Sequence, residues 1–196
     1  VPGDAVLVII DIVSDAVVGD IALSAANPNS VIVVGERIVV SGSAGFGDRA
    51  GGIDIIDTRS ATSLGLAITE TQLGGDLNYL VLRTSNAGFA IVLDENFANS
   101  IVPVDLATGS VGTPLEGLSG GYIASVAIDG NRLLIGDQGS FTDPSSAGLK
   151  IYDATTGVLL QGPINTGLPP NYIVVLNQAS ITAVREEHSA ALPVDT

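Results

Sequence analysis

A polar loop that runs from Asp137 to Asp143 has the residue types that could bind a metal ion. Carboxylate and carbonyl oxygens are hard ligands of the kind that Ca²⁺ prefers. The spacing differs from that of an EF-hand, which needs acidic residues at alternate positions, a glycine at the sixth and a distal glutamate. We therefore expect a solvated loop and no cofactor, with a Ca²⁺ site at Asp137 and Asp143 as the alternative.

Four other aspartates each end an apolar run and precede a turn of small or hydroxyl-bearing residues: Asp11, Asp57, Asp105 and Asp153. Successive members are 46, 48 and 48 residues apart. An aspartate in this position accepts hydrogen bonds from the backbone N–H groups of the turn that follows. We expect these four to be structural turn carboxylates, because each would lie on an outer hairpin and not in a shared catalytic or metal site.

Other reactive side chains are sparse, and no catalytic residue is expected. His188 is the only histidine, it lies in a polar tail (186–196), and one histidine supplies neither a zinc triad nor a Ser-His-Asp set. Cysteine is absent, which excludes disulfides and thiolate catalysis. Three tyrosines, Tyr79, Tyr122 and Tyr172, recur just before predicted inner strands. Their rings could stack on a sugar or peptide, although packing between neighbouring sheets is the commoner role.

The charge balance excludes one class of partner. The chain has 21 acidic and 7 basic residues, a formal net charge of −14, so a nucleic acid or an anionic membrane surface would be repelled. No apolar run approaches the roughly 18 residues needed to cross a bilayer, so no membrane span is expected. The hydrophobic content of 46% suits sheets that are covered on both faces.

The elements that must position these residues form a repeat. In its clearest copy, strands are predicted at 123–128, 132–136, 149–153 and 158–161, and the first two are joined by a hairpin turn at Asp129–Gly130–Asn131. Strand units that recur with a period in the forties are typical of β-propeller blades. We predict an all-β chain, a β-propeller of about four four-stranded blades of 46–48 residues.

The blade units are expected near residues 1–24, 25–70, 71–118, 119–165 and 166–185. The first unit has only two outer strands, and the last has only two inner strands, at Tyr172–Leu176 and Ile181–Arg185. Pairing of these halves would close a four-bladed ring, which is the alternative. Because four blades is the low end of the propeller range, we expect part of a larger ring whose remaining blades belong to the same, longer polypeptide.

The clearest copy resembles the YVTN-type propeller repeat. The matching segments are Ile128–Leu133, with its Asp-Gly-Asn-Arg turn, and Ile151–Thr155, which reads Ile-Tyr-Asp-Ala-Thr. No copy contains the Tyr-Val-Thr-Asn tetrad itself. The resemblance implies a secreted or cell-envelope protein, often a lipoprotein or surface-layer component of bacteria or archaea. It specifies a fold and not an activity.

These observations favour a non-enzymatic binding or structural propeller of the cell envelope or extracellular space, which presents its loops to a protein or glycan partner. The alternative is a Ca²⁺-dependent enzyme, a lyase or hydrolase that acts on sugars or lactones. An enzyme needs titratable side chains that converge, and the predicted inner strands offer almost none beyond Arg83.

Overall fold

The computed structural model describes residues 5–44, 50–140, 142–168 and 170–176. Its main elements are three four-stranded antiparallel sheets, each with its strands in chain order. The first blade contains β3 (Pro28–Val34), β4 (Arg37–Gly42), β5 (Gly52–Asp57) and β6 (Thr62–Thr69). The second contains β7 (Asp76–Leu82), β8 (Ala87–Leu93), β9 (Asn99–Asp105) and β10 (Ser110–Val111). The third contains β11 (Ile123–Asp129), β12 (Arg132–Asp137), β13 (Gly148–Asp153) and β14 (Leu159–Ile164).

A two-stranded hairpin, β1 (Val6–Asp11) and β2 (Ala16–Ala22), precedes the first blade and matches the two outer strands of a blade. Short helices occupy two connections: α1 (Glu70–Leu73) between the first and second blades, and a 3₁₀ turn, η1 (Pro144–Ser146), between β12 and β13. No helix in the described ranges is long and apolar enough to cross a bilayer.

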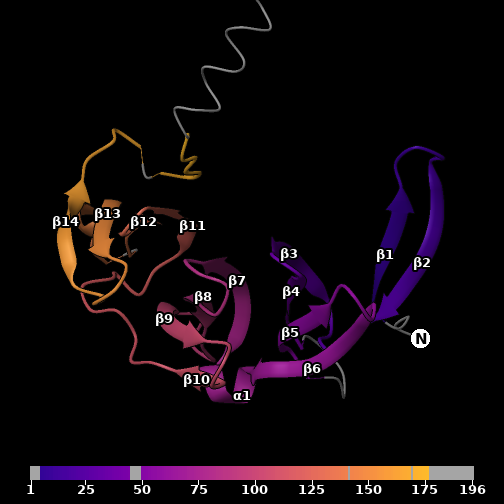
Figure 1. Cartoon of the computed structure of the whole chain (residues 1–196). Coiled ribbons are helices and arrows are strands. Elements are labelled where there is room, and N and C mark those ends of the chain that lie inside the picture. The colour runs from indigo at the N-terminus through magenta and orange to yellow at the C-terminus, as the bar shows by residue number, and fades with distance from the viewer. Residues whose placement is uncertain (1–4, 45–49, 141, 169, 177–196) are drawn as a thin grey trace, which may run out of the picture.

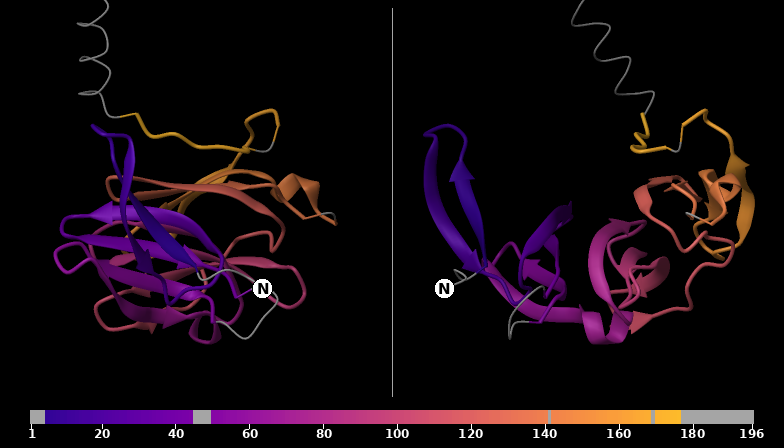
Figure 2. Two further views of the ribbon diagram at one scale, coloured as in Figure 1. Left: turned by 90° about the vertical axis from the view of Figure 1, so that its right-hand side faces the viewer. Right: turned by 180° about the vertical axis from the view of Figure 1, so that it is seen from behind.

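The sheets stand side by side in an open arc, with the β1–β2 hairpin at one end and the third blade at the other (Figures 1 and 2). This is the arrangement of β-propeller blades, and the predicted fold class is confirmed. The arc does not close into a ring.

The last predicted inner strand is wrong. Residues 172–176 follow the third blade as an irregular segment and take part in no sheet of the described chain. A strand needs a neighbour whose N–H and C=O groups it can pair with, and no sheet of the described chain pairs with this segment. The predicted partner Ile181–Arg185, the tail with His188, and residues 45–49 lie outside the described residues.

The core lies between the sheets and not within any one of them. One cluster, with Val39, Ile53 and Leu77, joins the first and second blades, and another, with Phe89, Ile101 and Leu133, joins the second and third. All six side chains are buried. Because each sheet depends on its neighbour for burial, the junctions between blades are rigid surfaces on which side chains can be held.

Candidate functional site

The turn aspartates all adopt one geometry. The Oδ1 atom of each accepts hydrogen bonds from the backbone N–H groups two and three residues later, over 2.7 to 3.3 Å. The residues are Asp11, Asp57, Asp105 and Asp153. Each carboxylate therefore holds its own turn, and the structure does not bring the four together in one site.

In two of these turns, hydrogen bonds from the backbone lower the pKa of the aspartate. Hydrogen bonds from the backbone, above all from Ser14, lower the pKa of Asp11 below its ordinary value of 3.8. The backbone N–H of Thr156 has the same effect on the pKa of Asp153. N–H donors favour the ionised carboxylate, so the anion itself is part of the turn.

Asp137 lies in the interior and not in a solvated loop. Its Oδ2 atom is 2.8 Å from the Nζ atom of Lys150, and the two side chains are 0% and 3% exposed. The backbone N–H groups of Ser119 and Gly139 also donate to this carboxylate, at 3.0 and 2.8 Å. Burial alone would raise the pKa of Asp137, but the Lys150 ammonium and the Ser119 and Gly139 hydrogen bonds outweigh it, and the net pKa is lowered.

The predicted calcium ligands have different surroundings. Asp137 is buried against Lys150, whereas Asp143 is exposed and its Oδ1 atom accepts hydrogen bonds from the N–H and hydroxyl groups of Ser145 at the start of η1. Nowhere in the described chain do three or more acidic, histidine or cysteine side chains gather as a metal-binding group. A Ca²⁺ ion at Asp137 would have to take the place of the Lys150 ammonium. The calcium site stays a prediction.

The ion pair fixes the linker between the second and third blades. Lys150 Nζ also donates to the carbonyl of Gly117 at 2.7 Å, and the Tyr152 hydroxyl donates to the carbonyl of Glu116 at 2.8 Å. Burial, with the nearby charge of Asp137 as a smaller cause, raises the pKa of Tyr152 to about 12, so the phenol stays protonated and keeps donating. These contacts hold the chain where it passes from one blade to the next.

The other two linkers are held by different carboxylates. Asp54, which is fully buried, accepts a hydrogen bond of 2.6 Å from the backbone N–H of Ser24 in the linker before the first blade. Glu70 in α1 accepts from the backbone N–H groups of Leu77 and Ala44, at 2.8 and 2.9 Å. Each junction between sheets thus has a buried or half-buried acid that orders the connecting chain.

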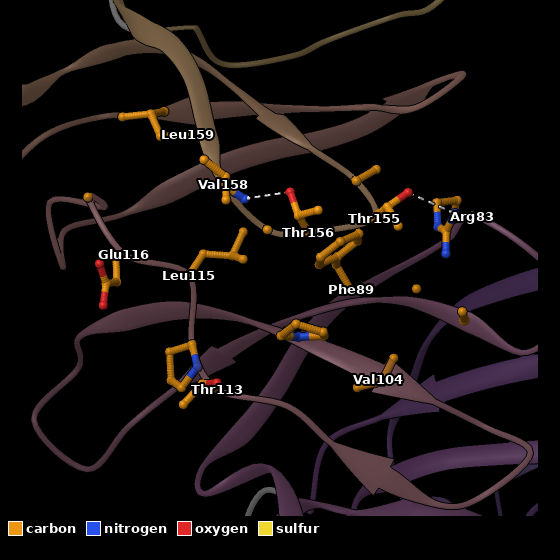
Figure 3. A pocket seen from close by; sticks show the side chains of 17 residues that line it. Arg83, Phe89, Val104, Thr113, Leu115, Glu116, Thr155, Thr156, Val158 and Leu159 are labelled. Carbon is orange, nitrogen blue, oxygen red and sulfur yellow. Dashed lines mark hydrogen bonds between the residues drawn. The ribbon is translucent and has the colours of Figure 1, made fainter.

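A cleft of about 730 Å³ lies between the second and third blades on the side of the hairpin turns (Figure 3). Among the described residues that line it, Arg83 and Glu116 are the charged ones, and Figure 3 shows them at opposite ends of the cleft. Arg83 donates a hydrogen bond of 3.4 Å to the Thr155 hydroxyl. Acid–base catalysis requires groups within hydrogen-bonding reach of one reacting atom, and this pair does not provide them.

A second concave surface lies between the inner strands of the same two blades, and we call it the tyrosine groove. It consists of two pockets, about 450 and 590 Å³, that share Asn78 and Tyr122. Its lining also includes Tyr79, Tyr172, Ser125, Phe97 and Asn99. Within the described part of the chain, no acidic or basic side chain lines either pocket.

The tyrosines of the groove expose their rings. Tyr79, Tyr122 and Tyr172 are 45%, 58% and 82% exposed, so the expected packing of these rings between blades is wrong. Tyr79 also lies within β7, whereas Tyr122 precedes β11 and Tyr172 lies in the irregular segment. The three rings nevertheless line one pocket.

Two buried polar atoms in the groove have no hydrogen-bond partner among the described residues: Asn99 Oδ1 and Ser125 Oγ. Asn99 is 6% exposed and Ser125 is 9% exposed. Unpaired buried polar atoms are uncommon because burial removes their hydration, so each calls for an explanation.

Reasoning from the sequence did not identify Asn99 or Ser125, but the repeats contain a signal for both. Register places Asn99 opposite the last residue of β8, where the other two blades have Gly52 and Gly148. Ser125 faces Gly136, whereas its counterpart Ser30 faces Ser41. At both positions, the residue that lines the groove or its cross-strand partner differs from the residue at the same place in another blade.

Comparisons with known proteins find similarity among solved structures. No family model matches the sequence, and no curated protein matches it. A solved structure that resembles it is described as the beta-propeller domain of the Trilobed protease from Pyrococcus furiosus, with an open velcro topology. Sequence identity is 13%, the TM-score is 0.48, and the match covers 69% of this chain. The chain matches 41% of the length of that structure.

Proposed function

We propose that this chain is a non-enzymatic binding propeller of the cell envelope or extracellular space, and that it presents one surface between blades to a protein or glycan partner. The tyrosine groove is the observation that supports this role. Exposed aromatic rings and uncharged hydrogen-bonding groups stand together on and beside β7 and β11, two strands that border the interblade core.

The distribution of titratable groups supports binding over catalysis. The buried acids Asp54 and Asp137 hold linkers, and the charged residues Arg83 and Glu116 of the cleft beside the hairpin turns stand apart. The resemblance of the repeats to YVTN-type sequences supports the proposed location. The net charge of −14 argues against nucleic acid as the partner.

Two measurements test the proposal. Antibody labelling of intact cells of the source organism should detect the protein at the surface, or fractionation should recover it with the envelope or medium. Incubation with a panel of lactones and aryl glycosides, with and without Ca²⁺, should give no turnover. Recovery in the cytoplasm would refute the location, and turnover that is lost on boiling would refute the non-enzymatic role.

A further inference from the structure

We propose that the tyrosine groove binds a neutral glycan, with Tyr79 and Tyr122 as stacking surfaces for sugar rings and with Asn99 and Ser125 as hydrogen-bonding partners of sugar hydroxyl groups. This inference rests on the proposed binding function and specifies the ligand class. Four features of the groove support it: the uncharged lining, the loss of hydrogen-bond partners at Ser125, the presence of Asn99 where the other blades have glycine, and the exposed aromatic rings.

The groove has no charged side chain among the described residues that line it. The sequence has 21 acidic and 7 basic residues and a net charge of −14, and the acidic groups of the described chain lie elsewhere. The polar lining residues carry hydroxyl or amide groups, for example Asn78, Asn96 and Ser140. Hydroxyl and amide groups can both donate and accept hydrogen bonds, as sugar hydroxyls do, and need no countercharge in the ligand.

Comparison of the blades shows that Ser125 has lost the partners of its counterpart. In the first blade, Ser30 and Ser41 share a hydrogen bond between their hydroxyls, and Ser41 donates to Asn29 Oδ1. In the third blade, Gly136 stands at the position of Ser41, and the residue before Ser125 is alanine. The Ser125 hydroxyl is therefore buried without a partner among the described residues, and because Ser125 belongs to the wall of the groove, a ligand hydroxyl can complete its hydrogen bonding.

Asn99 replaces a glycine at the adjoining position of the groove. The glycines that start the third strand in the other blades, Gly52 and Gly148, have φ values of 146° and 148°, a conformation that favours glycine. The second blade instead has an asparagine whose Oδ1 atom is buried, unpaired among the described residues and within the pocket lining. An amide of this kind supplies the specific polar contact that small-molecule sites typically have in small number.

The aromatic rings complete the recognition surface. Tyr79 and Tyr122 are about half exposed, so each offers a ring surface while the rest of the side chain is anchored. Phe97 lies at the rim with 81% of its surface exposed and with a φ of 61°, which is uncommon for a side chain of this size. Both pocket volumes fall within roughly 300–1,000 Å³, the range of small-ligand sites. A neutral glycan of a few sugar rings has both flat apolar faces and hydroxyl groups, which suit the aromatic rings and the polar side chains of the groove. An anionic glycan would be repelled by the net charge of the chain.

The chain itself provides the reporter for the binding experiment. It has no tryptophan and four tyrosines, and three of the four line the groove, whereas Tyr152 is buried in the core. The full chain is titrated with cellotetraose, chitotetraose, maltotetraose and mannotetraose, and binding is followed by tyrosine fluorescence and calorimetry. At least one tetrasaccharide should change the fluorescence saturably.

Three variants and a matched control test whether the sugar binds in the tyrosine groove. Tyr122→Ala should weaken it roughly tenfold or more, because it removes a stacking surface. Ser125→Ala and Asn99→Gly should each weaken it roughly threefold to tenfold. Ser125→Ala should do so without lowering the melting temperature, because the Ser125 hydroxyl has no hydrogen-bond partner among the described residues. Ser30→Ala is the control: it breaks a structural hydrogen bond, so it should lower the melting temperature and leave sugar affinity unchanged.

Three results would overturn the inference: no binding of any tetrasaccharide at millimolar concentration, binding that is unaffected by Tyr122→Ala and Ser125→Ala, or saturable binding of extended peptides to the same residues in place of sugars. Surface labelling and the turnover assay are independent of these titrations. A protein that is at the cell surface and inert, yet binds no sugar, would refute the glycan and leave the binding propeller in place.

Discussion

Replacement of Lys150 by methionine tests whether the buried ion pair holds the third blade to its linker. Methionine keeps most of the length and apolar volume of lysine but removes the ammonium that lies 2.8 Å from the carboxylate of Asp137. Asp137 would then be a buried charge whose remaining partners are the N–H and hydroxyl groups of Ser119 and the N–H of Gly139.

The size of the effect follows from burial. Removal of one partner from a buried ion pair costs about 3–5 kcal/mol, because the other charge stays desolvated. The two side chains are 3% and 0% exposed, so this range applies in full. For a domain of this size, 1 kcal/mol lowers the melting temperature by roughly 2–4 °C, so the expected shift is about 6–20 °C.

The assay is urea and thermal unfolding followed by circular dichroism, with two further variants. Arg59→Met is the matched control, because the Arg59–Glu36 pair is 73% and 65% exposed and its loss should cost less than about 1 kcal/mol. In the double variant Lys150→Met/Asp137→Asn, the amide oxygen can still accept from the Ser119 hydroxyl and the Gly139 N–H without a buried charge, whereas the Ser119 N–H loses its acceptor, so part of the stability should return. A Lys150→Met protein no less stable than Arg59→Met, or a double variant that loses the sum of the two single effects, would refute the reasoning.

Three other outcomes follow from the carboxylates. The folded state lowers the pKa of Asp137 below 3.8, so its stabilisation is complete at neutral pH and is lost as the pH falls through the folded-state value. Asp137→Asn should therefore be less stable at neutral pH and should show a flatter dependence of its unfolding free energy on pH below about 4 than the unsubstituted chain. Asp105→Ala leaves two turn N–H groups without their acceptor and should cost about 1–2 kcal/mol in urea unfolding, whereas Asp105→Asn should lose less. EGTA should leave the melting temperature unchanged, because Lys150 neutralises Asp137; a lower melting temperature that added Ca²⁺ restores would instead support the calcium site at Asp137 and Asp143.

The repeated sheets could be predicted from the sequence because their signals are local. Alternating apolar runs, a glycine-containing hairpin turn such as Asp129–Gly130, and a terminal aspartate together specify strand, turn and strand within a few residues. The positions of Asp105 and Asp153 at the ends of β9 and β13 follow from the same short-range chemistry.

The ion pair could not be predicted in this way because it depends on register. Asp137 is opposite Gly148 in the β12–β13 ladder, and Lys150, two residues further along β13, is its diagonal neighbour on the same face. From the sequence, Asp137 opens a polar loop and suggests a solvated residue. Its burial arises only when the linker with Ser119 covers it.

The tyrosine groove and the irregular segment 172–176 could not be predicted from the sequence for a related reason. The environment of Tyr122 depends on how the second and third blades meet, and no single repeat encodes that contact. Likewise, the apolar run 172–176 has strand-like composition, but composition alone does not provide a strand to pair with.

The buried residues that hold the linkers differ from one junction between sheets to the next. Tandem copies of similar sequence can exchange places while they fold, because one copy offers its neighbours nearly the same apolar face as the next. Here Asp54 and Lys150 occupy corresponding positions with opposite charge, and the middle sheet has the hydrophobic Ile101 and Val102 in that region. A misplaced copy would separate Asp54 from the backbone N–H of Ser24, or Lys150 from the carbonyl of Gly117, and would leave a buried charged group with one partner fewer. Gene rearrangements that shuffle these modules should therefore yield less stable products.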